Sequence, residues 1–87
     1  MSHRIEFALA AVRQFSKLPR DAQRRIAPYI DALAGQPRPE GAKRLVATEE
    51  LWRIRVGSYR VVYAVEGARL LVLVVKIGHR RDVYRGL

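Results

Sequence analysis

The first half of the chain changes its hydrophobic period near residue 8. In RIEFA, Arg4 to Ala8, apolar and polar residues alternate, which predicts a short strand. Apolar residues then recur at helical spacing up to Leu18, so we expect a helix over residues 8–17. Pro19 separates it from a second helical stripe, and the pattern therefore predicts two antiparallel helices. The second stripe consists of Ala22, Ile26, Ile30 and Leu33.

Pro28 interrupts the second stripe. Inside a helix, proline removes a backbone hydrogen bond and crowds the preceding turn, at a cost of about 3 kcal/mol. We therefore expect a kink at Pro28 or a helix that restarts after it. Gly35 ends the stripe, and the following GQPRPEGA is typical of a loop to about residue 42.

The second half of the chain has the pattern of strands. The segments LWRIRV, YRVVYAV and RLLVLVVKI are rich in β-branched and aromatic residues. Gly57-Ser58 and Glu66-Gly67 separate them, and both pairs suit hairpin turns. The whole pattern predicts a single domain over residues 1–87 of the α+β class, with two antiparallel helices followed by strands that are joined by hairpin turns.

A two-residue turn at Gly57-Ser58 gathers three arginines on one face of the sheet. Arg55 then pairs with Arg60, and because side chains alternate along a strand, Arg53 shares their face. The opposite face carries Trp52, Ile54, Val56, Tyr59, Val61 and Tyr63. Two arginines directly opposite each other cost up to about 1 kcal/mol without a counter-charge. The arrangement therefore predicts an anion site.

The charge of the chain supports an anionic partner. There are 17 basic and 8 acidic residues, a formal net charge of +9, and 14 of the basic residues are arginine, whose guanidinium matches phosphate oxygens bidentately. This balance indicates nucleic acid or an acidic protein as partner, and arginine-rich codon usage is the alternative source of the charge. A second alternative is a solvated face on which Glu49, Glu50 or Asp82 neutralises the arginine pair.

Several classes of function are not expected from this sequence. The longest apolar run, LLVLVV, has six residues, far short of the ~20 that span a bilayer, so no membrane segment is expected. The N-terminus lacks the apolar core of a secretory signal, so we expect a cytoplasmic protein. There is no cysteine, the two histidines lie far apart, and no acidic cluster has ligand spacing, so neither a metal nor a cofactor is expected.

The C-terminal segment KIGHRRDVYRGL carries groups that could act on a phosphate beside the arginines. Gly78 permits a bend there. An extended continuation would put one set of side chains on one side, namely Arg80, Asp82 and Tyr84. The other side would carry Arg81, Val83 and Arg85. With His79, the segment combines imidazole, guanidinium and phenol, which is acid–base chemistry beside a phosphate clamp.

Two stretches, LWRIRVGSYRVVYAV and VLVVKIGHRRDVYR, resemble the RelE branch of the RelE/ParE superfamily of toxins from type II toxin–antitoxin pairs. The opening IEFALAAVRQFSKLPRDAQRRI resembles that family's first strand and helical hairpin, so the resemblance covers nearly the whole chain. It implies an antiparallel sheet against two helices. It also implies a toxin that docks on ribosomal RNA and cleaves messenger RNA in the ribosomal A site, with a small acidic, RelB-like antitoxin as partner.

The resemblance places the family's catalytic positions on Arg60, Arg80 and Tyr84. Two basic positions on the preceding strand, lysines in the best-known member, fall on Arg53 and Arg55. The ParE branch, which poisons DNA gyrase without cutting RNA, shares the scaffold, and the three retained positions favour RelE over it. The alternatives are therefore a metal-independent endoribonuclease and a binding-only protein, either ParE-like or a degenerate homologue that keeps its antitoxin interaction.

Cleavage by the ribose 2′-hydroxyl needs a base, an acid and stabilisation of charge on the phosphate. Arginine supplies the last but does not deprotonate near neutral pH, so other side chains must move the protons. We assign Arg60 and Arg80 to the scissile phosphate, Tyr84 as base or stacking platform, and His79 as acid, with Lys76 as a further proton-transfer candidate. The residues expected to hold the RNA are Arg53, Arg55, Lys76, Arg81 and Arg85.

Overall fold

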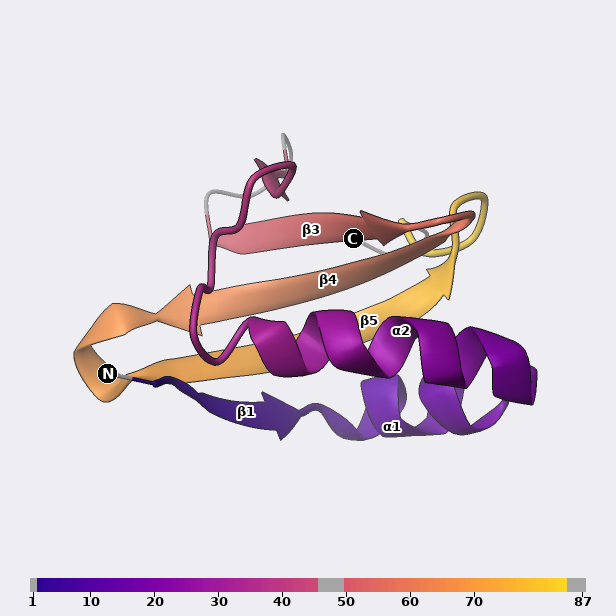
Figure 1. Cartoon of the computed structure of the whole chain (residues 1–87), viewed down its shortest axis with the longest axis horizontal. Helices are drawn as coiled ribbons and strands as arrows, with labels where there is room; N and C mark the ends of the chain where they lie inside the picture. The colour runs from indigo at the N-terminus through magenta and orange to yellow at the C-terminus, as the bar shows by residue number, and fades with distance from the viewer. Residues whose placement is uncertain (1, 46–49, 85–87) are drawn as a thin grey trace.

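The computed structural model describes residues 2–45 and 50–84, which form two helices and a five-stranded sheet (Figure 1). In chain order the elements are β1 (Arg4–Phe7), α1 (Leu9–Ser16), α2 (Arg20–Ala32), β2 (Lys43–Arg44), β3 (Leu51–Val56), β4 (Tyr59–Glu66), a 3₁₀ turn (Gly67–Arg69) and β5 (Leu71–His79). The strands lie in the order β1-β5-β4-β3-β2. Neighbours are antiparallel except β1 and β5, which are parallel. The predicted α+β fold is confirmed.

The helical hairpin forms without a side-chain cap at the start of either helix. Its turn is closed instead by Gln23, whose Nε2 donates to the carbonyl oxygens of Phe15 at 2.9 Å and Leu18 at 3.1 Å. These bonds satisfy carbonyl groups at the end of α1 that lack a partner within the helix. In the part of the chain that the structure describes, no helix is long and apolar enough to cross a membrane.

Helix α2 passes through Pro28 without a break, so the expectation of a helix that restarts there is wrong. The proline ring lies on the exposed side of the helix, while Ala22, Ile26 and Ile30 are buried on the other side, before and after it. Burial of this continuous apolar stripe offsets the lost backbone hydrogen bond.

The β3–β4 hairpin has the predicted register. Arg55 pairs with Arg60 and Val56 with Tyr59 across a turn in which Gly57 has φ +61°, a value that favours glycine. The hairpin predicted at Glu66-Gly67 is present, because β4 and β5 are antiparallel, but its connection is longer than those two residues, and Glu66 pairs with Leu71. A 3₁₀ turn follows β4, and the left-handed conformation falls on Leu70, at φ 50°.

The core lies between the helices and one face of the sheet. Its buried members come from both layers, and Ile26 of α2 and Val61 and Tyr63 of β4 are fully buried. The register places these β4 residues on the face that also carries Trp52 and Ile54, as the alternation predicts. The three arginines of the hairpin consequently lie on the opposite face.

Tyr63 ties the loop after α2 to the core. Its hydroxyl donates to the carbonyl oxygen of Pro37 at 2.7 Å. Burial raises the pKa of Tyr63 to about 12, and the positive charge of Arg38 opposes part of that shift. Because the neutral phenol is preferred in the folded state, this stabilisation is fully present below pH 10 and is lost as the pH rises from 10 to about 12.

We expect Tyr63→Phe to lower the free energy of unfolding by about 1–3 kcal/mol at neutral pH, because the carbonyl of Pro37 loses its donor. The variant should also lose less stability than the wild type between pH 10 and 12. Urea unfolding at pH 8 and pH 11 measures both effects. Tyr29→Phe, which alters an exposed tyrosine, is the control and should match the wild type. Equal alkaline losses in Tyr63→Phe and the wild type would contradict the assignment.

Candidate active site on the sheet face opposite the helices

The sheet face opposite the helices carries two rows of residues that run across the strands. The register fixes which residues share a row. The first row consists of Arg55, Arg60 and Gly78. The second row consists of Lys43, Arg53, Val62 and Lys76. The structure therefore confirms that the hairpin arginines are gathered, and it adds Lys43 and Lys76 to their face.

Arg60 is the buried cation of this face, with an exposed fraction of 7%. Its Nη1 donates to the carbonyl oxygens of Gly57 at 3.0 Å and Tyr59 at 2.9 Å. These bonds use two of the five guanidinium N–H groups, so three donors on Nε and Nη2 remain for an outside acceptor. The turn thus holds a cation in a fixed orientation, as a site that stabilises developing negative charge requires.

The tail after β5 folds back and is not extended, which corrects the predicted alternation of its side chains. The backbone N–H groups of Asp82 and Val83 both donate to the carbonyl oxygen of His79, at 2.8 and 3.0 Å. Residues 80–84 therefore form a turn. Val83 is 1% exposed, and a Cβ built on Gly78 would lie 3.7 Å from the Cα of Val83. The tail thus packs on the sheet at Gly78, beside Arg60.

A backbone contact ties this tail to the β3–β4 turn. The N–H of Arg80 donates to the carbonyl oxygen of Ser58 at 2.8 Å, so both segments meet at one end of the sheet (Figure 1). The side chains of Arg80 and Arg81 are exposed, and Tyr84 is 40% exposed. The structure therefore brings Arg55, Arg60 and the Arg80 backbone to the same turn. Arg85 lies outside the described residues.

His79 is not brought together with Arg60. It pairs with Tyr59, on the opposite face of the sheet, and the two rings meet edge to face with centroids 6.1 Å apart. Its Nδ1 accepts a hydrogen bond from the backbone N–H of Arg81 at 3.3 Å. Among the described residues, no three His, Asp or Glu side chains form a group that could hold a metal ion.

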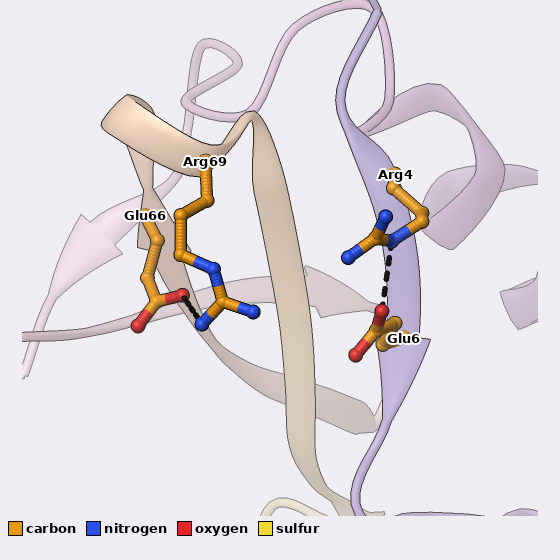
Figure 2. Close-up of polar contacts among 4 residues, drawn as sticks. All are labelled: Arg4, Glu6, Glu66 and Arg69. Carbon is orange, nitrogen blue, oxygen red and sulfur yellow. Dashed lines mark hydrogen bonds and ion pairs between the residues drawn. The ribbon is translucent and has the colours of Figure 1, made fainter.

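Three arginines at the end of the sheet make no ion pair with the protein's own carboxylates among the described residues. None of Arg55, Arg60 and Arg80 makes an ion pair there. Ion pairs do form elsewhere, between Arg4 and Glu6 at 2.8 Å and between Arg69 and Glu66 at 3.0 Å (Figure 2). Neutralisation by Glu50 or Asp82 is therefore not observed, and Glu49 lies outside the described residues. The site keeps its positive charge available to a ligand.

The sequence analysis missed Arg25, which α2 brings to the same turn. A Cβ built on Gly57 would lie 3.0 Å from Nη1 of Arg25, so this guanidinium lies against the turn that holds Arg60. A sequence signal exists, because Arg25 precedes the buried Ile26 and so borders the face that meets the sheet. Which strand it would meet depends on how the helix packs, and the helical pattern alone does not give that.

Comparison with known proteins gives consistent matches over nearly the whole chain. The sequence model of a family described as "ParE toxin of type II toxin-antitoxin system, parDE" matches residues 5–84. A Methanocaldococcus jannaschii protein named as a candidate toxin, RelE1, is 26% identical over 88 residues, which are 98% of each chain.

Solved structures share the fold. The archaeal RelE–RelB complex from Pyrococcus horikoshii OT3 matches with a TM-score of 0.80 and 27% identity, covering 95% of this chain and 100% of that chain. The toxin–antitoxin complex RelBE2 from Mycobacterium tuberculosis matches with a TM-score of 0.81, 22% identity and coverage of 92% and 100%. The intact E. coli RelBE complex matches with a TM-score of 0.80, 22% identity and coverage of 90% and 96%.

We expect Val83→Ala to release the tail turn from the sheet. Loss of its buried methyl groups should lower the free energy of unfolding by about 1–2 kcal/mol. The amide hydrogens of Asp82 and Val83 should also exchange faster with solvent, because their bonds to His79 weaken. Val12→Ala removes the same atoms from a side chain that is 49% exposed, and should change stability by less than about 0.5 kcal/mol. Unchanged amide exchange in Val83→Ala would show that Val83 does not anchor the tail.

Proposed function

Because the chain belongs to the RelE/ParE superfamily of toxins from type II toxin–antitoxin systems, we propose that it is a ribosome-dependent endoribonuclease that cleaves messenger RNA in the ribosomal A site. The proposal rests on Arg60, whose guanidinium is buried and keeps N–H groups that do not bond to the turn. Arg55 stands opposite Arg60, and neither arginine makes an ion pair among the described residues. A phosphodiester is the ligand that such a site fits best.

The proposed reaction is attack of a ribose 2′-oxygen on the adjacent phosphorus. The P–O bond to the 5′-oxygen breaks, and the products are a 2′,3′-cyclic phosphate and a free 5′-hydroxyl. Negative charge grows on the phosphoryl oxygens in the transition state. Nε and Nη2 of Arg60 and the guanidinium of Arg80 are assigned to those oxygens, where one positioned donor contributes about 3–4 kcal/mol by analogy with an oxyanion hole.

Proton transfer is assigned to side chains on the Arg60 side of the sheet. Tyr84 lies at the end of the tail turn that covers Arg60 and is half exposed, so it serves as base or as a platform for a base of the RNA. Lys76, one row from Arg60, is the proposed proton donor to the leaving 5′-oxygen. For His79 we now propose a positioning role, because its ring lies on the opposite face and holds the tail through Nδ1.

The proposed partners follow from the charge. Messenger RNA and ribosomal RNA would contact the basic face through their phosphates, so affinity should fall with salt. A small acidic antitoxin of the RelB kind would neutralise the toxin, since a polypeptide of opposite charge complements a net charge of +9. In support, the solved relative from Pyrococcus horikoshii is a RelE–RelB complex and that from Mycobacterium tuberculosis is a toxin–antitoxin complex.

A ParE-like, binding-only toxin is the second candidate. The specific observation in its favour is that the family description matching residues 5–84 is that of ParE. Such a toxin would inhibit DNA gyrase and leave messages intact. The two candidates differ in what appears in an induced cell, namely new RNA ends or inhibited supercoiling.

We expect Arg60→Lys to reduce cleavage of a translated message by about 10²–10³-fold, because lysine keeps the charge but loses the fork of donors. New 3′ ends of the message are mapped in cells after induction of the toxin. They are also mapped in a purified reaction with and without ribosomes, and the Tm of each variant is measured. Arg60→Ala also removes the two bonds to the turn, so its loss of activity would be mixed with a loss of stability.

Arg69→Ala is the matched control, because it removes one arginine that is exposed and already paired with Glu66. It should cleave like the wild type. Cleavage by Arg60→Lys at the wild-type rate would contradict the catalytic assignment. A toxic wild type that produces no new ends but inhibits gyrase would replace the nuclease with the ParE-like function.

Tyr84→Phe tests the proton-transfer assignment separately from stacking. Phenylalanine keeps the ring but not the hydroxyl, so we expect cleavage to fall about 10²-fold or more if Tyr84 is the base. The half-exposed ring should leave the Tm nearly unchanged. If Tyr84→Phe cleaves normally while Tyr84→Ala does not, the residue is a stacking platform only.

A further inference from the structure

The outer edge of β3 forms one wall of a groove. Strand β2 pairs with Arg53 and Trp52, and within the described residues no strand pairs with the outer edge beyond them. A hollow of about 310 Å³ lies there, between β3, α2 and the loop that precedes β2. We call it the β3-edge groove, and the lining residues used below are Tyr29, Glu40, Lys43, Arg53 and Arg55.

The groove is positively charged and holds an unsatisfied donor. Lys43, Arg53 and Arg55 contribute three positive charges against one carboxylate, Glu40. Nη1 of Arg53 is sealed from solvent and has no hydrogen-bond acceptor among the described residues. A buried donor without a partner is unfavourable, most of all on a charged group, so an anionic acceptor entering the groove would be bound favourably.

An exposed aromatic ring borders these cations. Tyr29 of α2 is 54% exposed and lies one helical turn after Arg25, the residue that reaches the β3–β4 turn. A single exposed tyrosine is unremarkable by itself. Here it lines the same hollow as Arg53 and Arg55. Aromatic rings beside a cationic groove are the platforms on which the bases of single strands stack.

We propose that the β3-edge groove binds the single-stranded RNA next to the scissile phosphate, with one base stacked on Tyr29 and neighbouring phosphates on Arg53 and Arg55. This inference rests on the proposed function. The groove is continuous with the site, because Arg55 both lines the groove and pairs with Arg60 in the register. Tyr29 therefore acts in substrate binding and not in the chemical step.

An added peptide strand is the competing occupant, since an unpaired strand edge accepts one through backbone hydrogen bonds. The features of the groove favour RNA. Its unsatisfied donor belongs to a charged side chain, and its lining combines an exposed aromatic residue with three cationic residues. A strand would use the backbone of β3 and needs neither feature.

The test measures binding of a fluorescein-labelled RNA octamer of mixed sequence by fluorescence anisotropy. The octamer carries 2′-O-methyl groups, so it cannot be cut by 2′-oxygen attack. Tyr29→Ala should weaken binding about 5–10-fold, from the loss of one stacked base. Tyr29→Phe should bind like the wild type, and so should Leu9→Ala, which changes a 64% exposed side chain on α1. Binding of the matching RNA duplex should not respond to Tyr29→Ala.

Arg53→Gln provides a second, independent variant. It should weaken binding of the octamer and reduce the slope of log affinity against log salt by about 0.7, as expected for one lost phosphate contact with a single strand. Arg69→Gln, at an arginine outside the groove, is the charge-matched control and should leave the slope nearly unchanged.

Equal octamer affinity for Tyr29→Ala and the wild type would overturn the inference. If Tyr29→Ala instead weakened binding of an antitoxin peptide, the groove would be a binding site for that peptide and not for RNA. Failure of the proposed function is visible separately. Suppose that the wild type cuts no translated message but binds the octamer in a Tyr29-dependent way. The proposed nuclease activity would then be rejected, and the proposed RNA binding in the groove would stand. If both the nuclease activity and RNA binding in the groove are correct, Tyr29→Ala should raise the KM for ribosome-bound message and leave kcat unchanged.

Discussion

The candidate site depends on the hydrogen bonds that hold Arg60 to the β3–β4 turn. Removing a guanidinium from water is unfavourable unless its N–H groups find acceptors, and here two carbonyl oxygens of the turn accept from Nη1. The positive φ of Gly57 shapes that turn. The carbonyl of Ser58, in the same turn, holds the start of the tail through Arg80. One tight turn therefore fixes the buried cation and the segment that covers it.

The charge distribution of this face is unfavourable in the free protein. Arg55 and Arg60 stand opposite each other without a described carboxylate between them, an arrangement that costs up to about 1 kcal/mol. Elsewhere the chain does pair its charges, as Arg4 with Glu6 and Arg69 with Glu66. A polyanion on the face would relieve the repulsion, which is how functional sites commonly depart from the rules that stabilise the rest of a fold.

Sequence reasoning succeeded where contacts are local. The turn at Gly57-Ser58 and the period of two fix the β3–β4 register, and with it the face of Arg53, Arg55 and Arg60. It failed where distant segments meet. A bond from residue 80 to residue 58 ties the tail to the β3–β4 turn, and the tail packs on Gly78, the neighbour of Arg60 in its row. In β5, apolar residues fill both faces, and the β4–β5 register shifts between Val62 and Tyr63, where Val75 is an extra residue in β5, so alternation could not assign His79.

The tail that packs beside Arg60 limits the direction from which a phosphate could reach its guanidinium. In its row, the neighbour on the β5 side is Gly78, on which Val83 packs, so that side is closed. The neighbour on the β3 side is Arg55, which is exposed. The free N–H groups of Arg60 are therefore approached over Arg55, along the path that leads from the β3-edge groove. In the proposed function, one arrangement of the sheet would therefore serve both the binding of the flanking strand and the contact with the scissile phosphate.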